Sequence, residues 1–212
     1  MSIKKPIFGS LLKRFPELEP CIADIIAAGE MLAETARTGN KYLICGNGGS
    51  AADADHICGE LIKSFCKKRP IKKELAKKLI KLDAKKGAML AKKLQAGVAA
   101  ISLNHHNALS TAFCNDVDPN LVFAQQCHVF GGKGDVFWGI STSGNAENVL
   151  NAALTAKAGG LKVLGLTGIK GGRLKDLCDV CICVPGTETH EIQELHLPVY
   201  HALCLYIEDI LW

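Results

Sequence analysis

The stretch KYLICGNGGSAADADHICGELI, residues 41–62, is the part of the sequence that decides the fold. Its beginning, residues 41–45, predicts a short buried strand, and the turn Gly46–Ser50 leads directly into a helical segment. Glycines let the backbone approach a ligand closely, and the start of the following helix offers unpaired N–H groups. A strand, a glycine turn and a helix in this order are typical of an α/β protein with ligand-binding loops at one edge of its sheet.

The same arrangement recurs further along the chain. An amphipathic helix is predicted over Cys21–Thr38, and a long helical segment runs from Glu188 to Leu211. Four more short apolar strands are predicted, at Val98–Leu103, Asp135–Ser141, Lys162–Thr167 and Val180–Val184. Because helical segments separate these strands, the pattern predicts a buried parallel sheet in a single α/β domain over residues 1–212.

Composition and charge set the class of protein. With 212 residues, 48% of them hydrophobic and 22% charged, the chain suits one globular domain. No apolar run approaches the roughly 18 residues that a membrane helix needs, so no membrane partner is expected. Residues 1–20, MSIKKPIFGSLLKRFPELEP, lack an apolar core followed by a cleavage site, which favours a cytoplasmic protein.

Ten cysteines lie mostly inside apolar segments, which favours buried free thiols over disulfides. Cys178 and Cys181 have CxxC spacing, but they lead into a predicted strand. A redox pair normally lies at a helix N-terminus, and a structural zinc site needs a second ligand pair. We therefore interpret these two residues as core cysteines.

Positive charge is concentrated between Lys63 and Lys93, where the sequence has thirteen Lys or Arg residues and only two acidic residues, Glu74 and Asp83. Five leucines near helical spacing predict a solvated basic helix in an insertion at about 66–96: Leu75, Leu79, Leu82, Leu90 and Leu94. A binding segment for nucleic acid or an acidic partner is the alternative. Interleaved aromatic residues are absent, so a nucleic-acid partner is not expected, and the role of the insertion stays open.

A second polar turn, Ser141-Thr142-Ser143-Gly144-Asn145, follows the third predicted strand. Three successive hydroxyls beside a helix N-terminus suit the oxygens of a phosphate monoester. Gly46, Gly48 and Ala51 also fit the dinucleotide pattern GxGxxA, but residues 64–69 lack the acidic residue that this motif requires. We therefore expect a phosphorylated small molecule and no nucleotide cofactor.

Four blocks together resemble the phosphoheptose isomerases of the sugar isomerase (SIS) domain superfamily: CGNGGSAADADH (45–56), GISTSGNAENVL (139–150), LTGIKGGRL (166–174) and IQELHLPVYH (192–201). The resemblance spans about residues 20–208. It implies a flavodoxin-like, three-layer α-β-α sandwich with a five-stranded parallel sheet, assembled as a homotetramer with active sites at subunit interfaces. It also implies conversion of D-sedoheptulose 7-phosphate to D-glycero-D-manno-heptose 7-phosphate.

The resemblance carries the substrate-binding residues of the family onto this sequence. They comprise the sugar-contacting glycine loop, an Asn-Asp pair, the phosphate-binding hydroxyls and one glutamine: Asn47, Gly48, Gly49, Ser50, Asn115, Asp116, Ser141, Thr142, Ser143 and Gln193. Ala146 stands where the family has a further serine.

The resemblance also implies zinc ligands, namely His56, Glu60, Gln193 and His201, with Glu60 and His201 as the acid/base pair. His56 and Glu60 are four residues apart and share one helix face, which makes a sensible half-site for a metal. Gln193 and His201 are about 80° apart around a regular helix, so we expect a bend at Pro198 to bring them together. His196 is the competing candidate on this helix, or else a packed histidine.

An aldose–ketose isomerase needs a base that moves a proton between adjacent carbons and an acid that serves the carbonyl oxygen. We expect Glu60 to be that base, through a cis-enediol, and His201 to be its acid partner. Two alternatives stay open at this point. One is a non-catalytic protein that senses a phosphosugar and regulates a partner, and the other is an etherase or aminosugar isomerase of the same superfamily.

Overall fold

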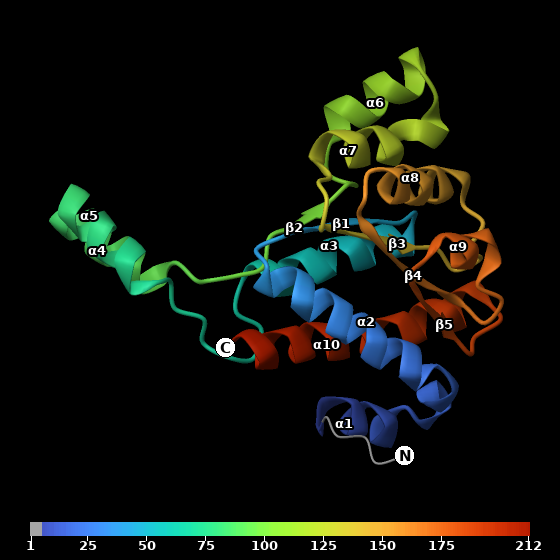
Figure 1. Ribbon diagram of the computed structural model, residues 1–212, viewed down its shortest axis with the longest axis horizontal. Helices are drawn as coiled ribbons and strands as arrows, with labels where there is room; N and C mark the ends of the chain where they lie inside the picture. Colours follow the sequence, from blue (N-terminus) through green and yellow to red (C-terminus); the bar gives the residue numbers. More distant parts are fainter. Residues whose placement is uncertain (1–5) are drawn as a thin grey trace.

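The computed structural model describes residues 6–212 as one α/β unit with a projecting pair of helices (Figure 1). Residues 1–5, which begin the segment without a predicted secretion signal, lie outside the described residues. The strands are β1 Tyr42–Cys45, β2 Ala100–Ser102, β3 Val136–Ile140, β4 Lys162–Gly168 and β5 Val180–Val184. The α-helices are α1 Pro6–Arg14, α2 Ile22–Arg37, α3 Gly49–Ile62, α4 Lys73–Leu82, α5 Ala84–Lys93, α6 Asn107–Asp116, α7 Val122–Phe130, α8 Glu147–Ala158, α9 Gly172–Leu177 and α10 Thr189–Leu211, with short 3₁₀ turns η1 Pro16–Cys21 and η2 Pro119–Leu121.

All five strands pair in parallel, in the order β2-β1-β3-β4-β5, which confirms the predicted sheet. β1, β3 and most of β4 are buried throughout, as strands covered on both faces must be. The predicted second strand is longer than β2, although its hydrogen bonds to β1 reach from Ala99 to Leu103. The strand order reverses between β1 and β3, and this switch point is where open α/β sheets bind ligands.

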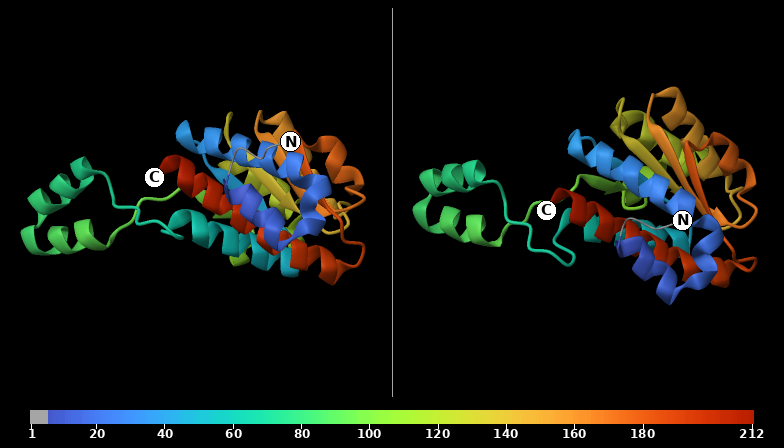
Figure 2. Two further views of the ribbon diagram at one scale, coloured as in Figure 1. Left: turned by 90° about the horizontal axis from the view of Figure 1, so that it is seen from below. Right: turned by 60° about the horizontal axis from the view of Figure 1, so that its bottom comes forward.

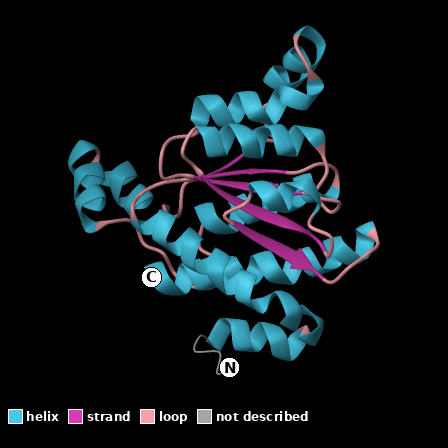
Figure 3. Cartoon of the chain, turned by 45° about the vertical axis from the view of Figure 1, so that its right-hand side comes forward, coloured by secondary structure: helices cyan, strands magenta, loops and turns pink. Residues whose placement is uncertain are grey.

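Helices cover both faces of the sheet, so the expected three-layer sandwich is confirmed (Figure 3). On one face, α1, α2, α3 and α10 pack on the alternate side chains Tyr42, Ile44 and Trp138. On the other face, α7, α8 and α9 pack on Leu43, Phe137 and neighbouring residues. The period-two alternation of the strands therefore divides the core into two apolar clusters.

The N-terminal region holds more helix than the sequence predicts. The expected helix over Cys21–Thr38 is present as α2, and Gly39 follows it with a positive φ of 78°. α1 was not predicted, because it is short and its apolar residues Phe8 and Leu11 become buried only against the rest of the fold. Tertiary packing rather than local propensity stabilises such a short helix.

The basic insertion forms a helical hairpin, α4–α5, that extends away from the sandwich (Figure 2). The single predicted helix is wrong, because Asp83 breaks it. Asp83 is extended, with φ −153° and ψ 113°, and its side chain accepts a hydrogen bond from the Lys86 N–H, which starts a second helix. Gly87 lets the two helices cross closely, since a Cβ there would overlap the Leu79 carbonyl. Most of the hairpin is exposed, as expected for a solvated basic segment.

Candidate active site

A cleft of about 320 Å³ opens at the carboxyl ends of β1 and β3, at the switch point of the sheet. Both predicted ligand loops contribute to it, together with the start of α10. Its lining residues are Asn47, Gly48, Gly49, Ser50, Ile140, Ser141, Thr142, Ser143, Ala146, Thr189 and Gln193. Eight of the ten residues predicted to bind substrate therefore lie together, and no charged side chain is among the lining residues.

The glycine loop has the backbone geometry that its sequence predicts. Gly48 has a positive φ of 55° and directly precedes α3, so its conformation favours glycine. Gly49 begins α3 beneath the amide of Gln193, because a Cβ at residue 49 would lie 2.6 Å from the Gln193 Nε2 atom. The missing side chain thus leaves room for the Gln193 amide over the start of the helix.

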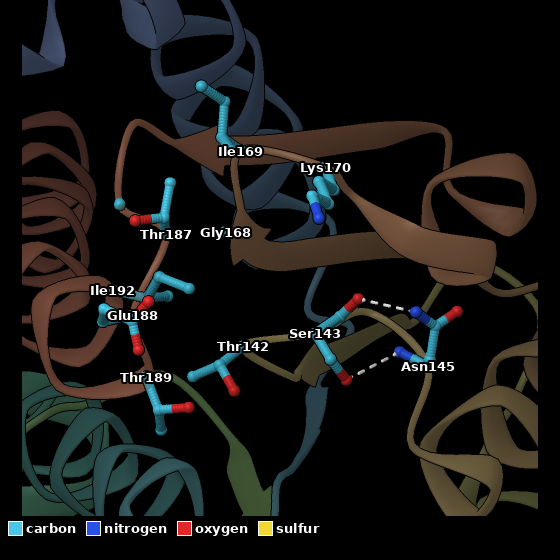
Figure 4. Close-up of a pocket in the computed structure, with 11 residues that line it drawn as sticks. Thr142, Ser143, Asn145, Gly168, Ile169, Lys170, Thr187, Glu188, Thr189 and Ile192 are labelled. Carbon is cyan, nitrogen blue, oxygen red and sulfur yellow. Dashed lines mark hydrogen bonds between the residues drawn. The ribbon is translucent and has the colours of Figure 1, made fainter.

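The hydroxyl loop leads from β3 into α8, again at a helix N-terminus. Gly144 has a positive φ of 64°, and a Cβ there would overlap the Gly171 carbonyl, so the turn packs tightly on the neighbouring loop. A second hollow of about 440 Å³ adjoins the cleft and shares Thr142, Ser143 and Thr189 with it (Figure 4). Lys170 lines this hollow and is the one basic residue among those that line the two cavities.

A cluster of ionisable side chains lies further along α3, where α10 packs against it. His56 Nε2 lies 3.5 Å from Glu60 Oε1, and the rings of His56 and His201 are 5.0 Å apart between centroids. The second oxygen of Glu60 accepts a hydrogen bond of 2.9 Å from Lys63. The structure therefore brings together His56 and Glu60, as their spacing predicts, and adds His201, which the resemblance alone had grouped with them.

Sequence reasoning missed two members of this cluster. Tyr200 donates a 3.3 Å hydrogen bond from its hydroxyl to Asp53, and the same hydroxyl lies 3.0 Å from His56 Nδ1. A hydroxyl that donates to Asp53 accepts from His56, which places the imidazole proton on Nδ1 and leaves Nε2 facing Glu60. The available signal was position: Asp53 is one helical turn before His56, and Tyr200 is next to His201.

Burial shifts the pKa values in this cluster. Desolvation raises the pKa of Asp53, although hydrogen bonding to Tyr200 and the nearby His56 oppose the shift. Desolvation lowers the pKa of His201, and the neighbouring His56 lowers it further. His201 is therefore predominantly neutral near pH 7. His196, the competing candidate, is fully buried, and desolvation lowers its pKa to about 4, as expected of a packed histidine.

Gln193 and His201 do not converge within one chain, so the convergence expected from a bend at Pro198 is not found. α10 runs without interruption from Thr189 to Leu211, with Pro198 buried in it. Eight residues of helix rise about 12 Å. Gln193 therefore lies at the cleft against Gly49, while His201 packs beside His56, two turns along α3.

Asn115 and Asp116 lie away from the other predicted site residues. They end α6, where they are exposed and the Asn115 amide donates a 2.8 Å hydrogen bond to Asp116. α6 packs mainly on η2 and α7, on the side of the sheet opposite α3 and α10 (Figure 1). Within one chain, these two residues do not line the cleft.

The cluster partly fits a metal ion. His201 Nε2 is buried and has no hydrogen-bond partner within the described residues, and His56 Nε2 faces a carboxylate. Both are nitrogens of the kind that zinc prefers. In residues 6–212, however, no group of three or more His, Cys, Asp or Glu side chains converges closely enough to hold an ion. The donors suit a metal, but one chain in this arrangement does not assemble the complete ligand set.

The cysteines are free and mostly buried, in agreement with the interpretation as core thiols. Cys181 is buried in β5, and its pKa is raised to about 12, chiefly by the neighbouring Cys178 thiol. Within residues 6–212, no helix is long and apolar enough to cross a membrane.

Comparison with known proteins agrees with this fold. The SIS domain family matches residues 9–93 and 91–168. The phosphoheptose isomerase of a Roseiflexus species is 38% identical over 188 residues, which cover 89% of this chain and 82% of that protein. The enzyme of the same name from a Nitratiruptor species is 40% identical over 185 residues, covering 87% and 85%.

Two solved structures extend the comparison to the whole fold. The phosphoheptose isomerase of Neisseria gonorrhoeae superposes with a TM-score of 0.74 at 31% identity, covering 95% of each chain. That of Francisella tularensis gives a TM-score of 0.76 at 28% identity, covering 95% of this chain and 94% of the other. The matches thus span most of the chain, and the chain belongs to the phosphoheptose isomerase family of SIS domain proteins.

Proposed function

We propose that this chain is an aldose–ketose isomerase that converts D-sedoheptulose 7-phosphate to D-glycero-D-manno-heptose 7-phosphate. The observation that carries the proposal is the grouping of Glu60, His56 and His201 beside a phosphate-type cleft in a member of this family. A protein that only sensed the sugar would need the cleft but not the grouped acid/base side chains.

The cleft supports binding of the phosphate end of the sugar. Ser141, Thr142 and Ser143 offer three hydroxyls and lie just before the N-terminus of α8, whose free N–H groups attract an anion. The lining lacks a lysine or arginine, so neutral donors would hold the phosphate. Asn47 and Gln193 lie at the opposite loop and the start of α10, where their amides can hydrogen-bond to sugar hydroxyls.

The reaction moves one proton between two carbons of the open-chain sugar. Glu60 removes a proton from C1 of the ketose, which gives a cis-enediol, and returns it to C2. His201 donates a proton to the oxygen on C2 and accepts the proton from the oxygen on C1. A neutral imidazole near pH 7 suits this exchange, and burial lowers the pKa of His201 in that direction.

Zinc is the proposed cofactor, with His56, Glu60, His201 and Gln193 as its ligands. When bound, the ion would polarise the sugar carbonyl and fix the open-chain form. The hydrogen bond between Tyr200 and His56 supports this assignment, because it leaves His56 Nε2 free for a metal. Gln193 lies two helical turns from the histidines, so a rearrangement or a second copy of the chain has to complete the ligand set.

A homotetramer with interfacial sites accounts for the residues that one chain leaves apart. Asn115 and Asp116 are exposed at the end of α6 and make a hydrogen bond only to each other among the described side chains. A neighbouring copy would place its Asn-Asp pair at the cleft of this chain. The proposed setting of the enzyme is the cytoplasm, where phosphorylated sugars are made.

Turnover of D-sedoheptulose 7-phosphate, followed by NMR with and without zinc, tests the function. Glu60→Gln should abolish aldose formation, whereas Glu74→Gln on the remote hairpin should not change it. Both variants remove one carboxylate, so a difference between them isolates the role of Glu60. Activity retained in Glu60→Gln would refute the base assignment, and no turnover by the folded wild-type protein would refute the substrate.

A further inference from the structure

A further cavity lies at the root of the α4–α5 hairpin and shares no lining residue with the catalytic cleft. It has a volume of about 560 Å³, within the usual range for small-molecule sites. We call it the root pocket. Its lining residues are Ser64, Phe65, Cys66, Lys67, Lys68, Arg69, Pro70, Lys92, Lys93, Leu94 and Gln95. None of them lines the catalytic cleft.

The root pocket carries an excess of positive charge. Its lining contains five basic residues and no acidic one. Two of the five are neutralised, since Arg69 pairs with Glu208 at 2.6 Å and Lys67 pairs with Asp209 at 2.7 Å. The side chains of the other three, Lys68, Lys92 and Lys93, make no hydrogen bond or ion pair within residues 6–212, so their charges are free for a ligand.

The walls of the pocket are held in place. The carboxylate of Glu208 accepts hydrogen bonds from three successive backbone N–H groups, those of residues 65–67, which fixes the segment that leads into the hairpin. The segment that leads out of the hairpin is joined to it, because the Gln95 side chain accepts from the Ser64 N–H at 2.8 Å and the Ala96 N–H donates to the Arg69 carbonyl at 2.7 Å. Arg69, only 2% exposed, is held between these two segments and α10 by its ion pair with Glu208.

We propose that the root pocket binds a small anion with two linked phosphate groups. A phosphate monoester carries about −1.5 to −2 charges near pH 7, which leaves three free lysines undercompensated, whereas a diphosphate adds charge and length. Lys68 precedes the hairpin, whereas Lys92 and Lys93 lie at its end, so the two phosphates of one ligand can pair with lysines on both sides of the pocket. Phe65, Pro70 and Leu94 add an apolar wall that suits an organic group attached to the diphosphate.

The position of the root pocket connects it with the catalytic helix. Arg69 Nη2 donates a 3.3 Å hydrogen bond to the Glu60 carbonyl, and Nη1 donates to the Leu61 carbonyl at 3.0 Å. An anion bound in the root pocket would therefore lie next to the last turn of α3, which carries Glu60. The binding itself depends only on the pocket and holds whichever sugar the cleft accepts.

Calorimetric titration of the full chain at physiological salt tests the proposal, with inorganic diphosphate and a nucleoside diphosphate as probes and inorganic phosphate for comparison. We expect saturable binding of both diphosphates, tighter than that of phosphate. The double variant Lys92→Ala/Lys93→Ala should weaken it about tenfold or more, since it removes two of the three unpaired charges that line the pocket. Its matched control, Lys77→Ala/Lys78→Ala, removes equal charge from α4 outside the pocket and should leave binding within about twofold.

Equal weakening by both double variants would overturn the proposal. It would mean that the anion is attracted by the overall positive charge of the hairpin and not by the pocket, as nucleic acid would also be. Binding that neither variant weakens would place the anion elsewhere, for example in the catalytic cleft, and would also overturn it. Tighter binding of the nucleoside diphosphate than of inorganic diphosphate would identify the organic form as the ligand source, and equal binding the inorganic form.

Discussion

Replacement of Glu208 by glutamine tests the contact that fastens the insertion to the sandwich. The side chains of Glu208 and Arg69 are each 1% exposed and lie 2.6 Å apart, while the Glu208 carboxylate also accepts three backbone N–H groups. Glutamine removes the negative charge and points an amide donor at these N–H groups. Because the variant leaves a buried guanidinium uncompensated, the free energy of unfolding should fall by about 3–5 kcal/mol.

Asp209→Asn is the matched control, one residue further along α10. Asp209 pairs with Lys67 at 2.7 Å, but its side chain is 57% exposed, so the loss should be about 0–1 kcal/mol. Urea unfolding at fixed protein concentration and pH 7 measures both free energies. A Glu208→Gln loss as small as that of Asp209→Asn would refute the reasoning.

The pH dependence provides a second check on Glu208. Burial alone would raise the pKa of this carboxyl, but the N–H groups of residues 65–67 and Arg69 hold it below its ordinary value. A lowered folded-state pKa contributes stability above the unfolded value of about 4.3, and that stability is lost as the pH falls through the folded pKa. The wild-type protein should therefore lose stability more steeply on acidification below about pH 4.3 than Glu208→Gln does.

Three further variants test the site. Tyr200→Phe should weaken zinc binding about 10- to 100-fold by calorimetry, because His56 loses its orienting partner; unchanged affinity would contradict this role. Gly144→Ala should lower the free energy of unfolding by more than Gly48→Ala does, measured by urea titration. Both glycines have positive φ, which costs an alanine about 1–2 kcal/mol, but only a Cβ at residue 144 would also overlap backbone atoms. Equal losses would argue against a tight turn at Gly144. Asn115→Ala should lower kcat/KM while the unfolding midpoint stays constant, and full activity would exclude this exposed residue from the site.

Local pattern predicted the parts of the fold that depend on a few adjacent residues. Short apolar runs gave the strands, and glycines before helices gave both loops of the cleft, because buried parallel strands and positive φ restrict residue choice strongly. Helical spacing also placed His56 and Glu60 on one face. The break at Asp83 was harder to foresee, since the lysines and leucines on either side share one helical pattern.

Long-range relations were the parts that spacing did not predict. Tyr200 and Asp53 are 147 residues apart and meet only because α10 packs on α3. Asn115 and Asp116 resemble the family's site residues in sequence, yet their helix lies on the other side of the sheet. No periodicity within a single segment contains the information about which elements meet, so resemblance supplies residue identities but not their placement in one chain.

The terminal helix α10 positions groups in three separate parts of the molecule. Its first turns bring Gln193 to the cleft, its middle brings Tyr200 and His201 to α3, and its last turns bring Glu208 to the root of the insertion. A continuous helix with a buried face is rigid, so these three groups keep spacings of about 12 and 10 Å along its axis. Gln193 cannot approach His201 without breaking that helix. In the proposed homotetramer, a second copy of the chain supplies the missing ligand without such a break, and the same copy brings its exposed Asn115–Asp116 pair to the cleft.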